Sequence, residues 1–304
     1  MTIAALAHKG LLDVSPAVST IDDAEVSLAF ALDKGYVECF KVMLASMAKQ
    51  GALCNSPIVI YSDDETLFDD PIIKLVSDKQ VLLRGSKKDT IYSLARDNVK
   101  RPEKSDWNRG TFLKWCVFEP QATRRLLFLD VDMLVLGSLE GLLNSSKDTP
   151  LVTCPQFQQS LKEGDVQNQL LDMLRGDFDA KHKRRINSGV MLINEALLTD
   201  AFFDEITGYA GQRVAIHEQG HLSDYFGKKS DLFAMAPSKY NYQDSYLRLL
   251  KNEGYQEILD QVSVLHYAGG AKPWNDAGSK LAGLASIDIW HEYKKLAHDV
   301  LLYR

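Results

Sequence analysis

The chain has 304 residues, of which 45% are hydrophobic and 25% are charged. This balance is typical of one large globular domain, or of two closely fused halves, with a substantial core. The 35 basic and 41 acidic residues give a net charge of −6. That charge argues against nucleic acid or an anionic membrane as the partner, because binding to such polyanions depends on basic surface.

Residues 1–24 are expected to form an extension ahead of the folded domain. His8 and Lys9 interrupt their apolar stretch before a signal-peptide core is complete, and no apolar run in the chain has membrane-spanning length. The cysteines show no paired metal-binding spacing and mostly lie in apolar surroundings, so we expect buried, reduced thiols. They are Cys39, Cys54, Cys116 and Cys154. These features together predict a cytoplasmic protein.

Strand and helix patterns alternate from residue 25 onwards, which is typical of an α/β protein. Residues 26–32 are apolar almost without interruption, which indicates a strand covered on both faces and hence a parallel sheet. Ligands of such sheets bind beyond the carboxyl ends of the strands, so Asp33 and Asp130 should face the same crevice. The first predicted elements are a strand at 25–33, a helix at 36–50, and strands at 57–62 and 80–84.

Residues 111–118 are predicted to form a helix that leads into the fourth strand, and its inner face carries Lys114. A lysine within an apolar stretch is costly to bury unless an anion pairs with it. Lys114 therefore either extends its amine to the surface or reaches an anionic ligand.

The fourth strand, at 126–129, runs into Asp130-Val131-Asp132. Alternation along the chain sends both carboxylates to one face. Two anions at such close range call for a cation between them, and hard divalent metals prefer oxygen ligands. A metal-bridged polyphosphate is the expected ligand, although acidic residues also end strands simply because the chain returns to water.

A second cluster follows the apolar run at 262–265 and extends from His266 to Trp274. His266 offers an imidazole to a metal such as manganese, and Gly269 and Gly270 let backbone N–H groups approach a phosphate closely. Lys272 supplies positive charge. Taken singly, each of these residues more often belongs to an ordinary glycine turn with a core tryptophan and a surface lysine than to a functional site.

Together with Asn187-Ser188-Gly189, which precedes another apolar strand, these clusters resemble the glycogenin-like family of retaining glycosyltransferases. That family includes bacterial lipopolysaccharide galactosyltransferases and plant galactinol synthases, and the resemblance covers most of residues 25–275. It implies a GT-A fold, which is a Rossmann-like α/β domain with a mostly parallel central sheet.

The resemblance also implies a donor site. Asp130, Asp132 and His266 would hold Mn²⁺, or in its place Mg²⁺, and the metal would hold the diphosphate of a UDP-sugar. Gly269 and Lys272 would contact the same phosphates. The remaining residues that the resemblance places around the donor are Ala31, Asp33 and Tyr36 near the uracil, Val131 between the two acids, Lys114 beside the phosphates, and Asn187, Ser188 and Gly189 in a turn along the sugar.

Two of these assignments have plain structural alternatives. Asp33 can cap the following helix, because Asp is a favoured N-cap residue. Asn187-Ser188-Gly189 can be an ordinary turn. Arg109 is a weaker substitute for an arginine that other relatives carry near the position of Phe112.

The segment His217-Glu218-Gln219 resembles a helix start near the anomeric carbon of the sugar, with Glu218 where the family usually has Asp. The alternative is that Glu218 merely meets the positive end of the helix dipole. Gln219 would hydrogen-bond the sugar or the leaving phosphate, and its neutral amide makes it an unconvincing nucleophile. With Lys114, these two residues are the catalytic candidates.

Further segments bear on the acceptor and on packing. Tyr240, Tyr242 and Tyr246 either stack on an acceptor sugar or pack inside the protein. The basic run 181–185 is expected to be a solvated loop, with an anion contact near the acceptor as the alternative. Residues 286–303 predict an amphipathic helix that packs on the domain, with docking to a membrane surface or a partner as the lesser alternative.

The sequence thus predicts a metal-dependent, retaining glycosyltransferase that moves a hexose or N-acetylhexosamine from a UDP-sugar to a hydroxyl of a saccharide, polyol or protein. The expected domain is 25–280, with a nucleotide-binding half at 25–136, an acceptor half at 137–280, and a C-terminal helix at 281–304. The alternatives are a sugar-nucleotide-forming nucleotidyltransferase, for which no glycine-rich triphosphate loop is found, and a catalytically inactive binding protein.

Overall fold

The computed structural model describes residues 25–98, 105–156, 166–176, 185–212, 217–250, 254–275 and 283–301. The expected extension at 1–24 lies outside this range, and so does the basic run except for Arg185, which is exposed. No helix within the described ranges is long and apolar enough to cross a membrane.

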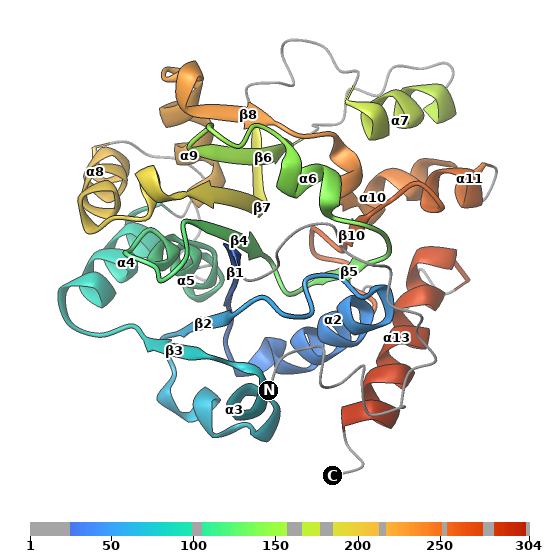
Figure 1. Ribbon diagram of the computed structural model, residues 1–304, viewed down its shortest axis with the longest axis horizontal. Coiled ribbons are helices and arrows are strands. Elements are labelled where there is room, and N and C mark those ends of the chain that lie inside the picture. The colour runs from blue at the N-terminus through green and yellow to red at the C-terminus, as the bar shows by residue number, and fades with distance from the viewer. Residues whose placement is uncertain are drawn as a thin grey trace.

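Within the described residues, seven strands form the main sheet in the order β3-β2-β1-β4-β7-β6-β8 (Figure 1). β7 runs antiparallel to both of its neighbours, whereas the other pairs are parallel. The predicted α/β fold with a mostly parallel sheet is confirmed. The strands are β1 (Val26–Ala31), β2 (Ile58–Ser62), β3 (Lys79–Leu82), β4 (Arg125–Leu129), β6 (Leu151–Pro155), β7 (Ile186–Asn194) and β8 (Phe233–Met235).

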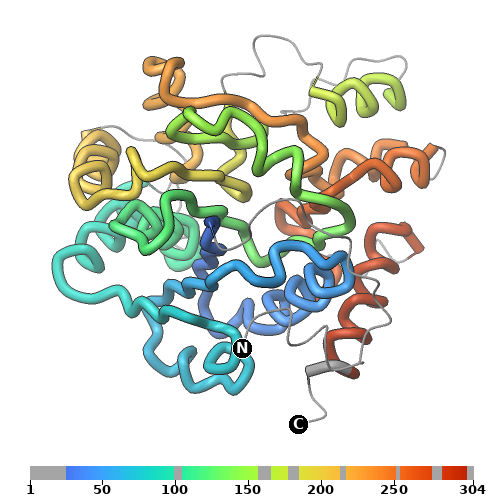
Figure 2. Tube along the Cα trace, viewed as in Figure 1, coloured from blue at the N-terminus to red at the C-terminus, as the bar shows by residue number. Residues whose placement is uncertain are grey.

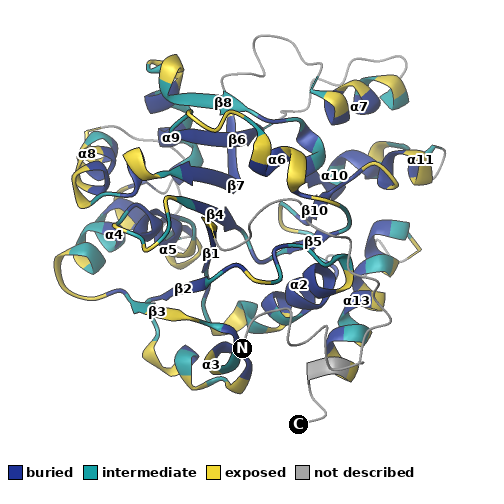
Figure 3. Cartoon of the chain, in the orientation of Figure 1, coloured by how far each residue is buried: buried dark blue, intermediate teal, exposed yellow. Residues whose placement is uncertain are grey.

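Helices cover both faces of this sheet, which explains why β1 is apolar throughout. Leu28 and Phe30 belong to one buried cluster, and Ala29 between them belongs to another, because alternate side chains of a strand point to opposite faces. Figure 3 shows the central strands as largely buried, with the exposed residues on the surrounding helices and loops. The longer helices are α2 (Val37–Gln50), α4 (Gly85–Asp97), α5 (Ser105–Leu113), α7 (Val166–Arg175), α8 (Asp200–Gly211), α9 (Glu218–Gly227) and α13 (Ala285–Leu301).

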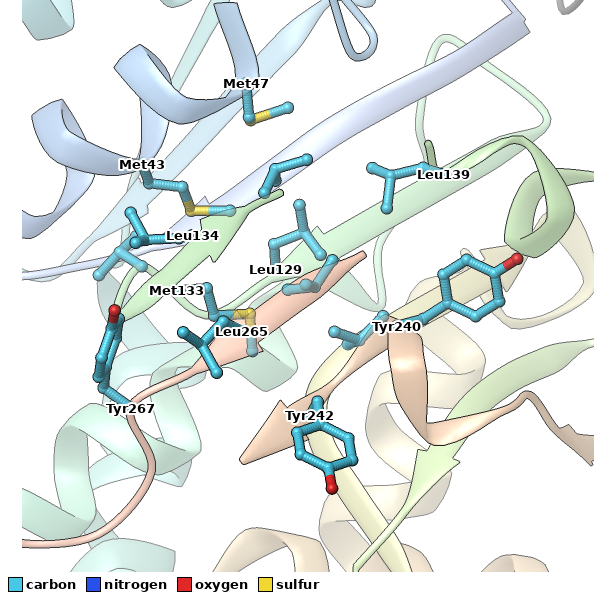
Figure 4. Packing of buried hydrophobic residues seen from close by; sticks show 14 of the residues in the cluster. Met43, Met47, Leu129, Met133, Leu134, Leu139, Tyr240, Tyr242, Leu265 and Tyr267 are labelled. Carbon is cyan, nitrogen blue, oxygen red and sulfur yellow. The ribbon is translucent and has the colours of Figure 1, made fainter. Parts of the chain in front are cut away.

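A smaller sheet of β5 (Met133–Val135), β10 (Val264–His266) and β9 (Tyr242–Gln243) lies next to the main sheet, with β10 in the middle. Its side chains continue the core (Figure 4), where Met133 and Leu265 pack near Tyr242. The shorter helices are α3 (Pro71–Val76), between β2 and β3 in the chain, and α6 (Glu140–Asn144), α10 (Asp244–Leu247) and α11 (Tyr255–Leu259).

The C-terminal helix α13 lies against α2, and Figure 2 shows these chain segments, blue and red, side by side. Trp290, Tyr293 and Ala297 are buried in the core shared by the two helices. The expectation that this amphipathic helix packs on the domain is confirmed.

The prediction that Asn187-Ser188-Gly189 forms a turn is wrong, because these residues lie inside β7. Thr153 of β6 pairs with Met191, but the next residue, Cys154, pairs with Asn187. Residues 188–190 are therefore extra on the β7 side and form a bulge, a device that redirects side chains and is frequent beside functional sites. A bulge of this kind has the same small, polar sequence as a turn.

The predicted helix at 111–118 is also wrong in its limits. α5 ends at Leu113, and the chain continues as a 3₁₀ helix, Lys114–Val117. The tighter winding turns Lys114 and the residues after it inward, and they are all buried.

The acceptor-stacking alternative for Tyr240, Tyr242 and Tyr246 is wrong. Each of them is at most 8% exposed, so their rings offer no face to a sugar. The cysteines behave largely as expected, since all four are free thiols and only Cys54 is partly exposed.

Candidate active site

Asp130, Asp132 and His266 lie together where the two sheets meet. Asp130 follows the last residue of β4, and Asp132 directly precedes β5. His266 ends β10 and pairs with Met133 in the antiparallel ladder, which places it beside Asp132. The ligand atoms of the three side chains lie within 4.8 Å of one another. Two carboxylates and an imidazole at this spacing suit a divalent cation such as Mn²⁺.

The charges around this cluster favour a bound cation. Lys272 donates a hydrogen bond to Asp132, and His266 Nε2 lies 3.3 Å from the other carboxylate oxygen. Burial alone would raise the pKa of Asp132, but Lys272 and His266 hold it well below its usual range. Burial raises the pKa of Asp130 more than Lys114 lowers it, and the charge of Asp132 adds to the rise. A cation would relieve this repulsion between buried carboxylates.

A hydrogen bond to Asn241 orients His266. Nδ1 of His266 lies 2.8 Å from Asn241 Oδ1, and an amide oxygen only accepts, so the ring proton belongs on Nδ1. Nε2 then faces the metal cluster, where it would offer its lone pair to a bound cation. The orientation of Asn241 is fixed in turn, because its amide donates to Asn187 Oδ1 at 3.0 Å, which also accepts from Gly189 N–H at 2.9 Å.

Lys114 joins the metal cluster to Glu218. Its Nζ lies 2.8 Å from Asp130 Oδ1 and 3.4 Å from Glu218 Oε1. Ser188 Oγ donates to the same Glu218 oxygen at 2.5 Å. Burial alone would lower the pKa of Lys114, but Asp130 and Glu218 raise it. Lys114 is only 6% exposed, so the alternative that its amine extends to the surface is wrong.

Glu218 opens α9, as the sequence predicted, and it is buried at 2% exposure. Burial opposes its ionisation, yet Lys114, His217 and hydrogen bonds from Ser188 and Thr111 lower its pKa. An acid that only met the helix dipole would lie at the surface, whereas Glu218 is an enclosed anion next to the metal cluster. Gln219 follows it in the same turn and is half-buried, and its contact with a sugar stays a prediction.

Gly189 allows β7 to approach the cluster closely. A Cβ at this position would lie 2.7 Å from Met133 Cε and 2.8 Å from His266 Cε1. The Gly189 carbonyl also accepts the Asp130 N–H at 2.8 Å. The bulge in β7 thus presents Ser188 and Asn187 to the site while the glycine leaves room for the imidazole.

At the expected nucleotide end, Asp33 accepts the Gly35 N–H at 2.8 Å and caps the 3₁₀ helix Lys34–Tyr36. The capping alternative is confirmed, and contact with uracil stays a prediction. Tyr36 packs edge-on against Trp274 with ring centroids 6.5 Å apart. Burial and the charge of Asp132 raise its pKa. Ala31 ends β1 at half-burial.

Two further candidates face other groups. Arg109 Nε lies 3.1 Å from Asp63, which follows β2 and also accepts from Tyr92 at 2.7 Å. The side chain of Val131 packs in the hydrophobic core rather than with the flanking acids.

The loop after β10 holds its shape through polar contacts. Gly269 has φ +93°, a conformation that favours glycine. Lys272 Nζ donates to the Tyr267 carbonyl at 2.5 Å, and Arg248 donates to the Ala271 carbonyl at 3.1 Å. Neither Arg248 nor Asn241 was predicted from the sequence. For Asn241 the available signal was a lone amide between two buried tyrosines, Tyr240 and Tyr242.

Comparison with known proteins identifies the family. The model of glycosyl transferase family 8 matches residues 27–278. The chain belongs to glycosyl transferase family 8. Among curated proteins it is 24% identical to the lipopolysaccharide glucosyltransferase WaaO of Escherichia coli (strain K12) over 277 residues, which cover 83% of this chain and 73% of that protein. It is likewise 24% identical to an Escherichia coli lipopolysaccharide 1,2-glucosyltransferase, with 93% and 82% covered.

Solved structures of other glycosyltransferases show the same fold. The glycosyltransferase GlyE of Streptococcus pneumoniae TIGR4 matches with a TM-score of 0.60 and 17% identity. The match covers 91% of this chain but only 63% of the GlyE chain. The galactosyltransferase LgtC, solved with donor and acceptor sugar analogs, matches with a TM-score of 0.52 and 17% identity, covering 88% of this chain and 95% of that one. The predicted family and GT-A fold are confirmed, and the protein is a glycosyltransferase.

Proposed function

We propose that this family 8 glycosyltransferase takes its sugar from a UDP-sugar, depends on Mn²⁺, and transfers a hexose or N-acetylhexosamine to a hydroxyl with retention of anomeric configuration. The observation that carries the proposal is the cluster of Asp130, Asp132 and His266, bordered by Lys114 and Lys272. Lysine charge beside a divalent-cation site suits a diphosphate, and a hydroxyl acceptor follows from the family's activity.

In this proposal the bond between the anomeric carbon and the diphosphate oxygen breaks, and its electrons leave with UDP. The acceptor oxygen forms the new bond on the same face, and its proton leaves with UDP. A bound cation would supply Lewis-acid stabilisation of the leaving group. Lys114 and Lys272 add positive charge there, and Glu218 stabilises the positive charge that develops on the sugar.

The test is calorimetric titration of UDP with and without Mn²⁺, together with an assay of Mn²⁺-dependent UDP release from a panel of UDP-sugars. Asp132→Asn removes one ligand charge at nearly constant shape. We expect UDP affinity to fall at least about tenfold in the variant, since loss of even an outer partner of a metal ligand costs this much. Asp231→Asn, at an exposed carboxylate outside the site, is the matched control.

UDP affinity that is unchanged by excess chelator would rule out the metal-bridged donor. UDP binding without release of UDP from any donor would instead favour the inactive binding protein. An enzyme that consumed a sugar phosphate and a nucleoside triphosphate would be the nucleotidyltransferase.

A further inference from the structure

One face of α5, together with the start of the 3₁₀ helix that follows it, leads from the metal cluster to the protein surface. Trp107, Thr111 and Lys114 follow one another at spacings of four and three residues, which places them on the same side of a helix. The whole stripe is about 10 Å long at the rise of an α-helix. Its inner end is buried, whereas the Trp107 side chain is 53% exposed.

Each residue of this stripe faces the start of α9. Lys114 Nζ lies 3.4 Å from Glu218 Oε1, and Thr111 lies close enough to Glu218 to help lower its pKa. The Trp107 ring meets the His217 ring edge-on, with centroids 6.1 Å apart and an interplanar angle of 89°. His217 Nδ1 in turn lies 3.8 Å from Glu218 Oε2. The exposed tryptophan is therefore linked through His217 to the enclosed carboxylate beside the metal cluster.

We propose that Trp107 and His217 form a binding subsite for a sugar ring of a saccharide acceptor. This inference rests on the proposed function and names the acceptor class. A sugar ring has an apolar face of C–H groups and a rim of hydroxyls. The large, rigid ring of Trp107 can stack on the apolar face at a low cost in conformational entropy. The partly exposed imidazole of His217 can form hydrogen bonds to the hydroxyls.

The exposure of Trp107 distinguishes it from the other aromatic side chains considered for stacking on an acceptor sugar. Tyr240, Tyr242 and Tyr246 are closed off by burial. Of the large hydrophobic side chains in the described ranges, Trp107 and Leu249 are the exposed ones, and Leu249 has no ring to stack on a sugar. A tryptophan two helical turns from Lys114 can hold one ring of an acceptor while another part of it reaches the anomeric carbon.

The test measures UDP release in the presence of lactose, maltose or cellobiose as saccharide probes and glycerol as a polyol probe. Trp107→Ala should raise the KM of the best disaccharide at least tenfold while kcat changes less than threefold. Trp107→Tyr, which keeps an aromatic face, should restore KM to within threefold of the wild type. Leu249→Ala, an equally exposed apolar position, is the matched control and should leave KM unchanged.

Binding is followed independently by tryptophan fluorescence. Disaccharide should shift the emission of the wild type to shorter wavelength, and this shift should disappear in Trp107→Phe. If the wild type releases UDP from no UDP-sugar, the proposed function itself fails. If the wild type is active but KM and fluorescence are unaffected at Trp107, or if glycerol is used as well as every disaccharide, the subsite is wrong and the function stands.

Discussion

The role of Glu218 depends on the side chains around it, which the structure shows and the sequence does not. Its place at a helix start was predictable from the sequence, but its enclosure by Lys114, Ser188 and Thr111 was not. These contacts keep a buried carboxylate ionised, and an anion held beside the metal cluster is suited to stabilising positive charge on the sugar.

We therefore predict that Glu218→Gln lowers kcat by about 10²-fold, the usual effect of removing one preorganised electrostatic group, and that the product keeps its anomeric configuration. Steady-state kinetics and the proton NMR spectrum of the product measure both quantities. Full activity would show that Glu218 acts only at the helix start. Rescue by azide as a glycosyl azide would indicate a covalent role, and an inverted product would end the retaining assignment.

Asn241 acts on the metal site through His266. Replacing it by Ala removes the oxygen that holds the proton on Nδ1, so both tautomers become accessible and the imidazole loses its fixed orientation. We predict that Asn241→Ala weakens Mn²⁺ binding by about 10–100-fold, the range found for such outer partners. Titration calorimetry measures the affinity, and ¹⁵N NMR of His266 reports the tautomer in the metal-free protein.

Asn241→Asp keeps the accepting oxygen and serves as the conservative variant, which should retain the Nδ1–H tautomer. An Asn241→Ala protein with normal Mn²⁺ affinity and an unchanged tautomer would mean that Asn241 contributes only to packing. Thermal unfolding of both variants separates loss of metal from loss of fold.

At the scale of elements, the sequence predicted the strands well where apolar runs decide them, and less well where the backbone departs from regular geometry. β1 and β4 could be predicted because each is a continuous run of apolar residues. The bulge in β7 could not be predicted, because it depends on the pairing of Cys154 with Asn187 across two distant segments. The same holds for the change to a 3₁₀ helix at Lys114, whose amine contacts Asp130 and Glu218 from distant segments of the chain.

A capping contact links α2 and α3. Asp70 accepts from the N–H groups of Ile72 and Ile73 at 2.8 and 3.2 Å, and Lys41 Nζ lies 2.9 Å away. Burial opposes ionisation, but these hydrogen bonds lower the pKa of Asp70. Because the folded pKa lies below the unfolded one, the stabilisation is complete above the unfolded pKa of about 3.9 and is lost as the pH falls through the folded value.

We predict that Asp70→Ala lowers the free energy of unfolding by about 1–2 kcal/mol at neutral pH, which is the usual cost of losing such a cap. The difference from the wild type should shrink below pH ~4. Urea unfolding at neutral and acidic pH measures it. Asp70→Asn keeps the capping oxygen without the charge, so it should be milder than Ala and show less pH dependence; a pH-independent difference for Ala would contradict the ionic contribution.

At the scale of the whole molecule, the site depends on segments from both ends of the described chain. Asp130 follows β4, which pairs with β1 near the start of the described chain, and β10 near its end places His266 beside Asp132. The sequence predicted that these motifs meet at one ligand, because each follows an apolar run and the spacing matches a known family. It could not show what supports the loop from Tyr267 to Trp274, since that support comes from α13 through tertiary contacts.

Trp290 of α13 is the centre of this support. It is 1% exposed and packs against Trp274 with ring centroids 5.1 Å apart, and Tyr267 Oη donates to the Ser286 carbonyl at 2.5 Å.

We predict that Trp290→Ala lowers the free energy of unfolding by about 3–5 kcal/mol, as expected for a large buried aromatic side chain. Urea unfolding measures this loss, and Lys295→Ala on the exposed side of the same helix is the control. Since Trp274 borders Lys272, UDP affinity in the folded variant should also fall. A loss below about 1 kcal/mol, within the range of surface substitutions and their errors, would show that α13 does not hold the loop.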